Sequence, residues 1–280
     1  MKNWDIQKLL PLLRECGETA LKYYDNPPIE IKADKSIVTA ADKAIEARLA
    51  EEFDRPDEGI YLIGEETVKS RSEEYIQNAL KGTAWVVDPI DGTAPYSVQL
   101  PAWGISIALM ENGVIKEGAI YLPPQNDCLI TDNDKVLRCS DVRGGGKLEL
   151  FDFKPHPLTP DGIIGISQYC TKNNIFTMSN QIFSWSGCVA SFYKLFLGKI
   201  MAYVASLSLW DIAASLAIME RSTMIARHHG GKNLSTQVDN NIFDLEADSP
   251  KRWKLHDYAI AAPDDETIDF VLKNSNLPEL

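Results

Sequence analysis

Two aspartates, Asp88 and Asp91, lie three residues apart in the segment 85–93, which reads WVVDPIDGT. The β-branched run before Asp88 is typical of a buried strand. Pro89 fixes its own φ and restricts Asp88 to extended conformations, so the backbone itself orients the carboxylates. Gly92 lets the chain pass close to a ligand, and free amides at the start of a helix bind phosphate oxygens. Because carboxylates bind hard cations, the segment predicts a metal-assisted phosphate site.

Asp-Pro and Asp-Gly are also common turn dipeptides, so the motif taken alone favours an ordinary turn. The sequence around it favours a functional interpretation. Residues 103–109 (WGISIAL) have the pattern of a second apolar strand, and Glu111-Asn112-Gly113 predicts a hairpin turn into residues 114–121. Acidic side chains at the end of a core strand need a partner, and a cation would supply it.

Two further acidic segments accompany this motif. Glu65 and Glu66 end a short apolar strand pattern, and only one of them can reach a shared site, because successive side chains of an extended chain face opposite sides. Asp211 opens a strongly apolar helix over residues 212–219, where taken alone it would be an ordinary N-cap. Near the start of the chain, Thr39 is predicted to cap a helix, with Asp42 completing a capping box.

The segments GEET at 64–67, DPIDGT at 88–93 and WDIAA at 210–214, in this order, resemble the inositol monophosphatase family of magnesium-dependent, lithium-sensitive phosphatases. The resemblance extends from VTAAD at 38–42 to AIAA at 259–262. It implies an α/β (α+β) fold, a layered αβαβα sandwich in which residues 1–280 form a single phosphatase domain. About 1–150 would carry most metal ligands, and about 151–280 would carry Asp211 and the substrate side of the pocket.

The resemblance also implies the roles of individual residues. Two Mg²⁺ ions would be bound by Glu65, Asp88, the Ile90 carbonyl, Asp91 and Asp211, with a third, weakly held ion near Glu65. The catalytic residues would be Glu65, Thr93 and Asp42, which orient a metal-activated water; Asp42 accepts a hydrogen bond from Thr93. The substrate would be bound by Asp91, Gly92, Thr93, Gly187 and Asp211.

Composition limits the partners. The formal charge of −12 provides no basic stripe for a nucleic-acid polymer, whereas metal ions would reverse the local sign for a small phosphorylated metabolite. Five widely spaced cysteines without a Cys-x-x-Cys pair indicate reduced thiols. No signal-peptide block or membrane-length apolar run is found, so a cytoplasmic enzyme without membrane association is expected. The resemblance implies a homodimer.

The substrate stays open at this point. Hydrolysis of inositol monophosphate or a related sugar phosphate is predicted first, yet no acidic residue lies between Lys199 and Trp210, where inositol-specific members carry a glutamate. A 3'(2'),5'-bisphosphate nucleotidase or a fructose-1,6-bisphosphatase is the alternative, with Lys199 or Arg221 receiving the second phosphate. A non-catalytic metal-binding regulatory protein is the alternative of another class. His228 and His229 are interpreted as surface or pocket-rim residues.

Overall fold

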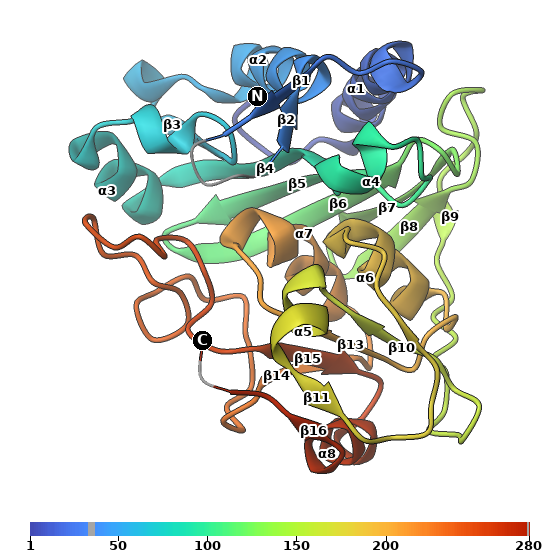
Figure 1. The fold of residues 1–280 in the computed structure, drawn as a ribbon. Coiled ribbons are helices and arrows are strands. Elements are labelled where there is room, and N and C mark those ends of the chain that lie inside the picture. Colours follow the sequence, from blue (N-terminus) through green and yellow to red (C-terminus); the bar gives the residue numbers. More distant parts are fainter. Residues whose placement is uncertain (33–36, 279) are drawn as a thin grey trace.

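The computed structural model describes residues 1–32, 37–278 and 280, and its elements stack in five layers (Figure 1). The first layer holds helices α1 (Ile6–Tyr24) and α2 (Ala40–Phe53). The second is a seven-stranded sheet in the order β3-β4-β5-β6-β7-β8-β9. Its strands are Ile60–Gly64, Thr83–Asp91, Gly104–Glu111, Val114–Leu122, Asp127–Asp132, Lys135–Cys139 and Glu149–Leu150.

The other three layers come from the second half of the chain. Helices α6 (Cys188–Phe196) and α7 (Leu209–Met219) form the middle layer. A five-stranded sheet follows in the order β12-β10-β13-β15-β14, and helices α5 (Gln168–Asn173) and α8 (Asp265–Lys273) cover its far face (Figure 1). Its strands, in sheet order, are Ile182–Phe183, Ile164–Ile166, Ala202–Ala205, Ala259–Ala262 and Ile225–His228. The layered αβαβα prediction is therefore confirmed.

Smaller elements complete the chain around these layers. A hairpin of β1 (Ile29–Ile31) and β2 (Ile37–Thr39) precedes α2, and α3 (Glu73–Lys81) packs beside β3. The short helix α4 (Thr93–Ser97) follows β4 directly. Strands β11 (Ile175–Phe176) and β16 (Ser275–Asn276) form a separate two-stranded sheet. Turns of 3₁₀ helix occur at Pro56–Glu58 and Val68–Ser70.

Helix α7 is apolar on every side because both of its faces are covered by sheets. Every residue of α7 except Asp211 is buried. It lies directly against β6, where a Cβ on Gly118 would come 2.4 Å from the carbonyl oxygen of Ala214, so this approach requires glycine. In the described part of the chain, no helix combines the length and the apolar character needed to cross a bilayer.

The predicted helix starts are largely confirmed, with one correction. Thr39 caps α2, and the capping box with Asp42 is formed. Asp211 is not the N-cap of α7: Ser208 takes that position, and Asp211 lies three residues later, where its carboxylate accepts the Ser208 amide. The helix begins at Leu209, three residues before the apolar run 212–219 expected from the sequence, so that Leu209, Trp210 and Asp211 lie in its first turn.

Candidate metal centre

The two aspartates of the central motif lie at the end of β4, where the ladder with β5 is irregular. The register shifts between Asp88, which pairs with Ser106, and Asp91, which pairs with Gly104. Pro89 has no N–H to offer the ladder, so a bulge is expected there. Residues three apart on a regular strand would face opposite sides. With the bulge, Asp88 and Asp91 line one cavity, and both are almost fully buried.

Glu65 reaches the same cavity from the neighbouring strand. Strand β3 runs parallel to β4 with Gly64 opposite Val87, so Glu65 emerges beside Asp88. The Lys32 ammonium lies 3.0 Å from a Glu65 carboxylate oxygen and 2.6 Å from one of Glu66. Glu66, the second acid of this segment, is therefore paired and not a solvated charge. Its side chain is only 10% exposed, and burial, then the charge of Glu65, raises its pKa to about 7.

Glu46, which the sequence analysis did not single out, fixes the backbone that carries Glu65. This buried side chain accepts the amides of Glu66 at 2.9 Å and Thr67 at 2.8 Å, one from each carboxylate oxygen. It lies one turn after Asp42 on α2, on the same face of the helix. That i, i+4 spacing of two acids on an apolar helix face was the signal available in the sequence.

Thr93 lies at the start of α4 with its hydroxyl held from two sides. Its Oγ1 lies 3.3 Å from an Asp42 carboxylate oxygen and 3.1 Å from the Ile90 carbonyl oxygen, and it can donate to either. Gly92 before it has φ 87°, in the left-handed region, and a Cβ there would lie 2.8 Å from the Ala102 carbonyl oxygen. Glycine is thus required for the turn that brings Thr93 beside Asp42.

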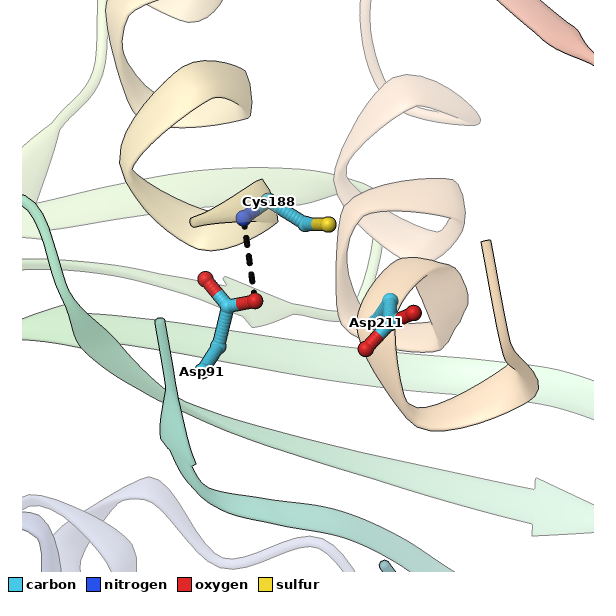
Figure 2. A group of neighbouring side chains, drawn as sticks. All are labelled: Asp91, Cys188 and Asp211. Carbon is cyan, nitrogen blue, oxygen red and sulfur yellow. Dashed lines mark hydrogen bonds between the residues drawn. The ribbon is translucent and has the colours of Figure 1, made fainter. Parts of the chain in front are cut away.

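The second half of the chain closes the cavity with the N-terminal turns of α6 and α7 (Figure 2). The two Asp91 carboxylate oxygens accept the amides of Cys188 at 2.9 Å and Val189 at 2.6 Å. Gly187 lies just before them, where a Cβ would be 2.5 Å from the Ala102 carbonyl oxygen. One ligand atom each of Asp91, Cys188 and Asp211 lie within 4.8 Å of one another.

The carboxylates lie close together in a buried site, and this raises their pKa values. Burial, and after it the charges of Glu65, Asp91 and Asp211, holds the pKa of Asp88 well above its usual range. Burial raises the pKa of Asp91 to about 7 although the two α6 amides oppose the shift. Burial and then Asp91 likewise raise the pKa of Asp211. Burial raises the pKa of Asp42 as well. This excess of negative charge is what a bound cation would relieve.

The donors fit a hard cation. Asp88 Oδ1 is buried and has no hydrogen-bond partner among the described residues, and Asp88 is one of the residues that line the cavity. The ammonium of Lys32 already places one positive charge against Glu65. The cavity measures about 460 Å³, and every predicted ligand lines it: Glu65, Asp88, Ile90, Asp91 and Asp211. Oxygen donors of this kind favour Mg²⁺ over zinc.

The rest of the cavity wall was not predicted. It carries hydroxyl, amide, aromatic and amine groups from α5 and the end of β13, namely Ser167, Gln168, Tyr169, Lys172, Tyr203 and Ser206. No sequence motif marks these residues, because they come close to the metal ligands only when the second half of the chain folds. Among the described residues, the acidic ones that line the cavity all belong to the predicted metal set.

Three residues considered from the sequence lie elsewhere. Arg221 pairs with Glu117 at 3.0 Å and donates to backbone carbonyls, and Lys199 lines a different cavity with Arg138. Neither borders the cavity of the acidic residues, so neither can receive a second phosphate there. His228 is 5% exposed inside β14, so its assignment to the surface was wrong. Burial lowers its pKa.

Comparisons with known proteins agree with this geometry. A sequence model described as the inositol monophosphatase family matches residues 5–222. An inositol monophosphatase from Dictyostelium discoideum is 27% identical over 81% of this chain and 86% of its own length. A histidinol-phosphatase from Chlorobaculum parvum is 31% identical over 78% of this chain and 83% of its own. A solved IMPase/NADP phosphatase complexed with Mg²⁺ and phosphate superposes with TM-score 0.67 at 19% identity, covering 96% of this chain and 94% of its own.

Proposed function

Because this chain belongs to the inositol monophosphatase family, whose relatives are phosphatases, we propose that it is a Mg²⁺-dependent phosphomonoesterase of small phosphorylated metabolites. Inositol monophosphate or a related sugar phosphate is the proposed substrate. The observation that carries the proposal is the meeting of Glu65, Asp88, Asp91 and Asp211 around one cavity, with Asp88 Oδ1 left without a partner. The Mg²⁺ and phosphate named for the solved neighbour support the choice of ion.

In this proposal Glu65, Asp88 and the Ile90 carbonyl hold one Mg²⁺, and Asp88, Asp91 and Asp211 hold the second. A third ion would be weakly held near Glu65. When bound, the ions neutralise phosphoryl oxygens, lower the pKa of water and stabilise the leaving alkoxide. Asp88 would serve as a ligand to both ions, and its place on β4, next to β3 and ahead of Asp91, supports this assignment.

The chain's own groups orient the reactants. Thr93 and Glu65 position the attacking water, and Asp42 holds the Thr93 hydroxyl by accepting its hydrogen bond. The amides of Gly92 and Thr93 receive phosphate oxygens. Gly187 lets this segment pack closely against the first half of the chain beside Asp91, because any side chain there would meet the Ala102 carbonyl oxygen. No covalent intermediate on serine or cysteine is needed.

The site takes residues from both halves of the chain. Asp88 and Asp91 come from the first sheet, whereas Cys188 and Asp211 come from helices that pack between the sheets. We therefore propose that residues 1–280 act as one phosphatase domain, and that neither half, 1–150 or 151–280, is active by itself.

A phosphate-release screen with MgCl₂ tests the function. Inositol 1-phosphate, fructose 1,6-bisphosphate, adenosine 3',5'-bisphosphate and histidinol phosphate are compared, with EDTA as the control. We expect release from at least one of the first three. Histidinol phosphate is expected to be poor, because among the described residues that line the cavity its cationic part would find no carboxylate outside the metal set. Failure to hydrolyse any phosphoester would favour a non-catalytic metal-binding protein on the same fold.

A substrate with a second phosphate is the second candidate, and Lys172 is the observation that favours it. This lysine belongs to α5 and lines the same cavity as the acidic residues. No carboxylate of the described residues is paired with it. The carboxylates of the metal set would be occupied by Mg²⁺, so that Lys172 is the basic side chain available to a distal phosphate among the described residues that line this cavity.

Replacing Lys172 with methionine should lower kcat/KM for fructose 1,6-bisphosphate relative to fructose 1-phosphate about fivefold, the effect of one exposed ion pair. Lys172→Arg should restore the ratio. Lys199→Met removes the same charge from a different cavity and is the matched control, with no expected change. Equal ratios in the wild type and Lys172→Met would exclude the second phosphate from this position.

We also propose that the chain forms a homodimer through an apolar surface beside the site. Val98 is 65% exposed and Leu100 56%, and both line a cavity of about 680 Å³ together with Trp185. Phe183, which is 44% exposed, stacks on Trp185. Contiguous exposed apolar surface of this kind marks an interface. Leu100→Asp should convert a dimer to a monomer in light scattering after gel filtration. A monomeric wild type at micromolar concentration would contradict the proposal.

A further inference from the structure

One thiol stands among the oxygen donors of the metal centre. Cys188, the first residue of α6, offers its sulfur within 4.8 Å of ligand atoms of both Asp91 and Asp211 (Figure 2). The Tyr203 hydroxyl lies 3.5 Å from this sulfur, in position to donate a hydrogen bond to it. Neither Mg²⁺ nor a phosphate ester has a use for a thiol, because both bind oxygen and nitrogen groups.

A second observation indicates that a cation could bind in the same cavity as that sulfur. Asp88 is 1% exposed, its Oδ1 has no partner among the described residues, and it lines the same cavity as Cys188. A buried carboxylate oxygen without a donor indicates a site for a positive ligand. The cavity thus offers one sulfur and several oxygens around the same volume.

We propose that Asp91, Cys188 and Asp211 bind a thiophilic divalent cation such as Zn²⁺, which excludes Mg²⁺ from this position and so inhibits the enzyme. The inference rests on the proposed function, since Asp91 and Asp211 are the ligands assigned to the second Mg²⁺. Three protein ligands with a fourth position open suit tetrahedral Zn²⁺. Ligand atoms around zinc lie roughly 3.5 Å apart, so closing the group requires side-chain movement of roughly 1 Å.

Binding is an exchange of a proton for a metal. The Cys188 S–H bond breaks, the proton leaves to solvent, and the sulfur electron pair forms the bond to the cation. No electron is transferred and no oxidant is needed. The Tyr203 hydroxyl would stabilise the thiolate by donating a hydrogen bond to it. The positive charge of the cation would offset the negative charge of the neighbouring carboxylates, which otherwise disfavours a thiolate.

Cobalt(II) absorbance tests the sulfur bond without relying on activity. Protein stripped with EDTA and desalted is titrated with CoCl₂, and we expect the near-ultraviolet charge-transfer band of a cobalt–thiolate bond. Cys188→Ser and Cys188→Ala should both lack the band. Two different substitutions are used so that the test still stands if one of the variants fails to fold. Cys16→Ala removes a thiol buried in α1 and should keep it. Excess MgCl₂ should diminish the band.

Inhibition supplies the second readout. The ZnCl₂ concentration that halves Mg²⁺-dependent phosphate release, measured against each variant's own activity, should rise about tenfold or more in Cys188→Ser. No band in the wild type, or a band that survives in Cys188→Ser, would overturn the inference. A band that MgCl₂ leaves unchanged would refute the claim that the thiophilic cation and Mg²⁺ bind at the same position. Absence of phosphatase activity in every condition would instead refute the proposed function, because the cobalt titration is independent of turnover.

Discussion

Asp88→Asn is expected to lower Mg²⁺-dependent kcat by about a thousandfold or more, because this carboxylate is assigned to both metal ions. An amide keeps the volume and one oxygen but loses the charge that binds the cations. The measurement is phosphate release from the best substrate of the screen over a range of MgCl₂ concentrations. High MgCl₂ should not restore the rate.

The same variant should fold at least as well as the wild type when no metal is present. Asp88 is buried among Glu65, Asp91 and Asp211, so removing its charge relieves repulsion. The melting temperature in EDTA is therefore expected to be unchanged or higher. Asp134→Asn, at an exposed loop position, is the matched control and should change neither property. Turnover in Asp88→Asn close to that of the wild type would refute the assignment of the metal centre.

The parts of this site that follow local rules could be predicted from the sequence. The strand before Asp88, the turn at Gly92 and the apolar helix after Asp211 each arise from short-range preferences of the chain. Lys32 could not be predicted, because it lies in a short hairpin whose position against Glu65 depends on tertiary packing. The approach of Cys188 to Asp91 could not be predicted either, because the two residues lie about a hundred positions apart and no local pattern connects them.

Two acidic residues of the site are each held by a capping box, which the sequence predicts for only one of them. Asp42 and Asp211 each occupy the third helical position of a capping box. In each, Oδ2 accepts the N-cap amide, at 2.8 Å from Thr39 and 2.7 Å from Ser208. The box fixes the carboxylate and leaves Oδ1 for another partner, which for Asp42 is Thr93. Reading Asp211 as the N-cap gave the right helix but the wrong reason for the orientation of its carboxylate.

Without metal, the chain is expected to lose stability as the pH rises from about 4 to about 7. Burial raises the pKa of Asp91 and Glu66 to about 7 and moves those of Asp88 and Asp211 upward too. In the unfolded chain these groups titrate near 4. The folded state therefore binds more protons across this window, and the free energy of unfolding falls as they are lost.

Magnesium should reverse this trend, since it binds the ionised carboxylates and replaces the protons. At about a hundred times its Kd, a ligand stabilises by about 2.7 kcal/mol, which corresponds to a rise in Tm of about 5 °C for a chain of this size. We expect Tm in EDTA to be lower at pH 8 than at pH 6, and MgCl₂ to raise Tm more at pH 8. Asp88→Asn should show a weaker pH dependence in EDTA and a smaller response to MgCl₂. A wild-type Tm in EDTA that climbs between pH 6 and pH 8 would mean that the carboxylates are satisfied by the protein alone, and that the pocket was not built around a cation.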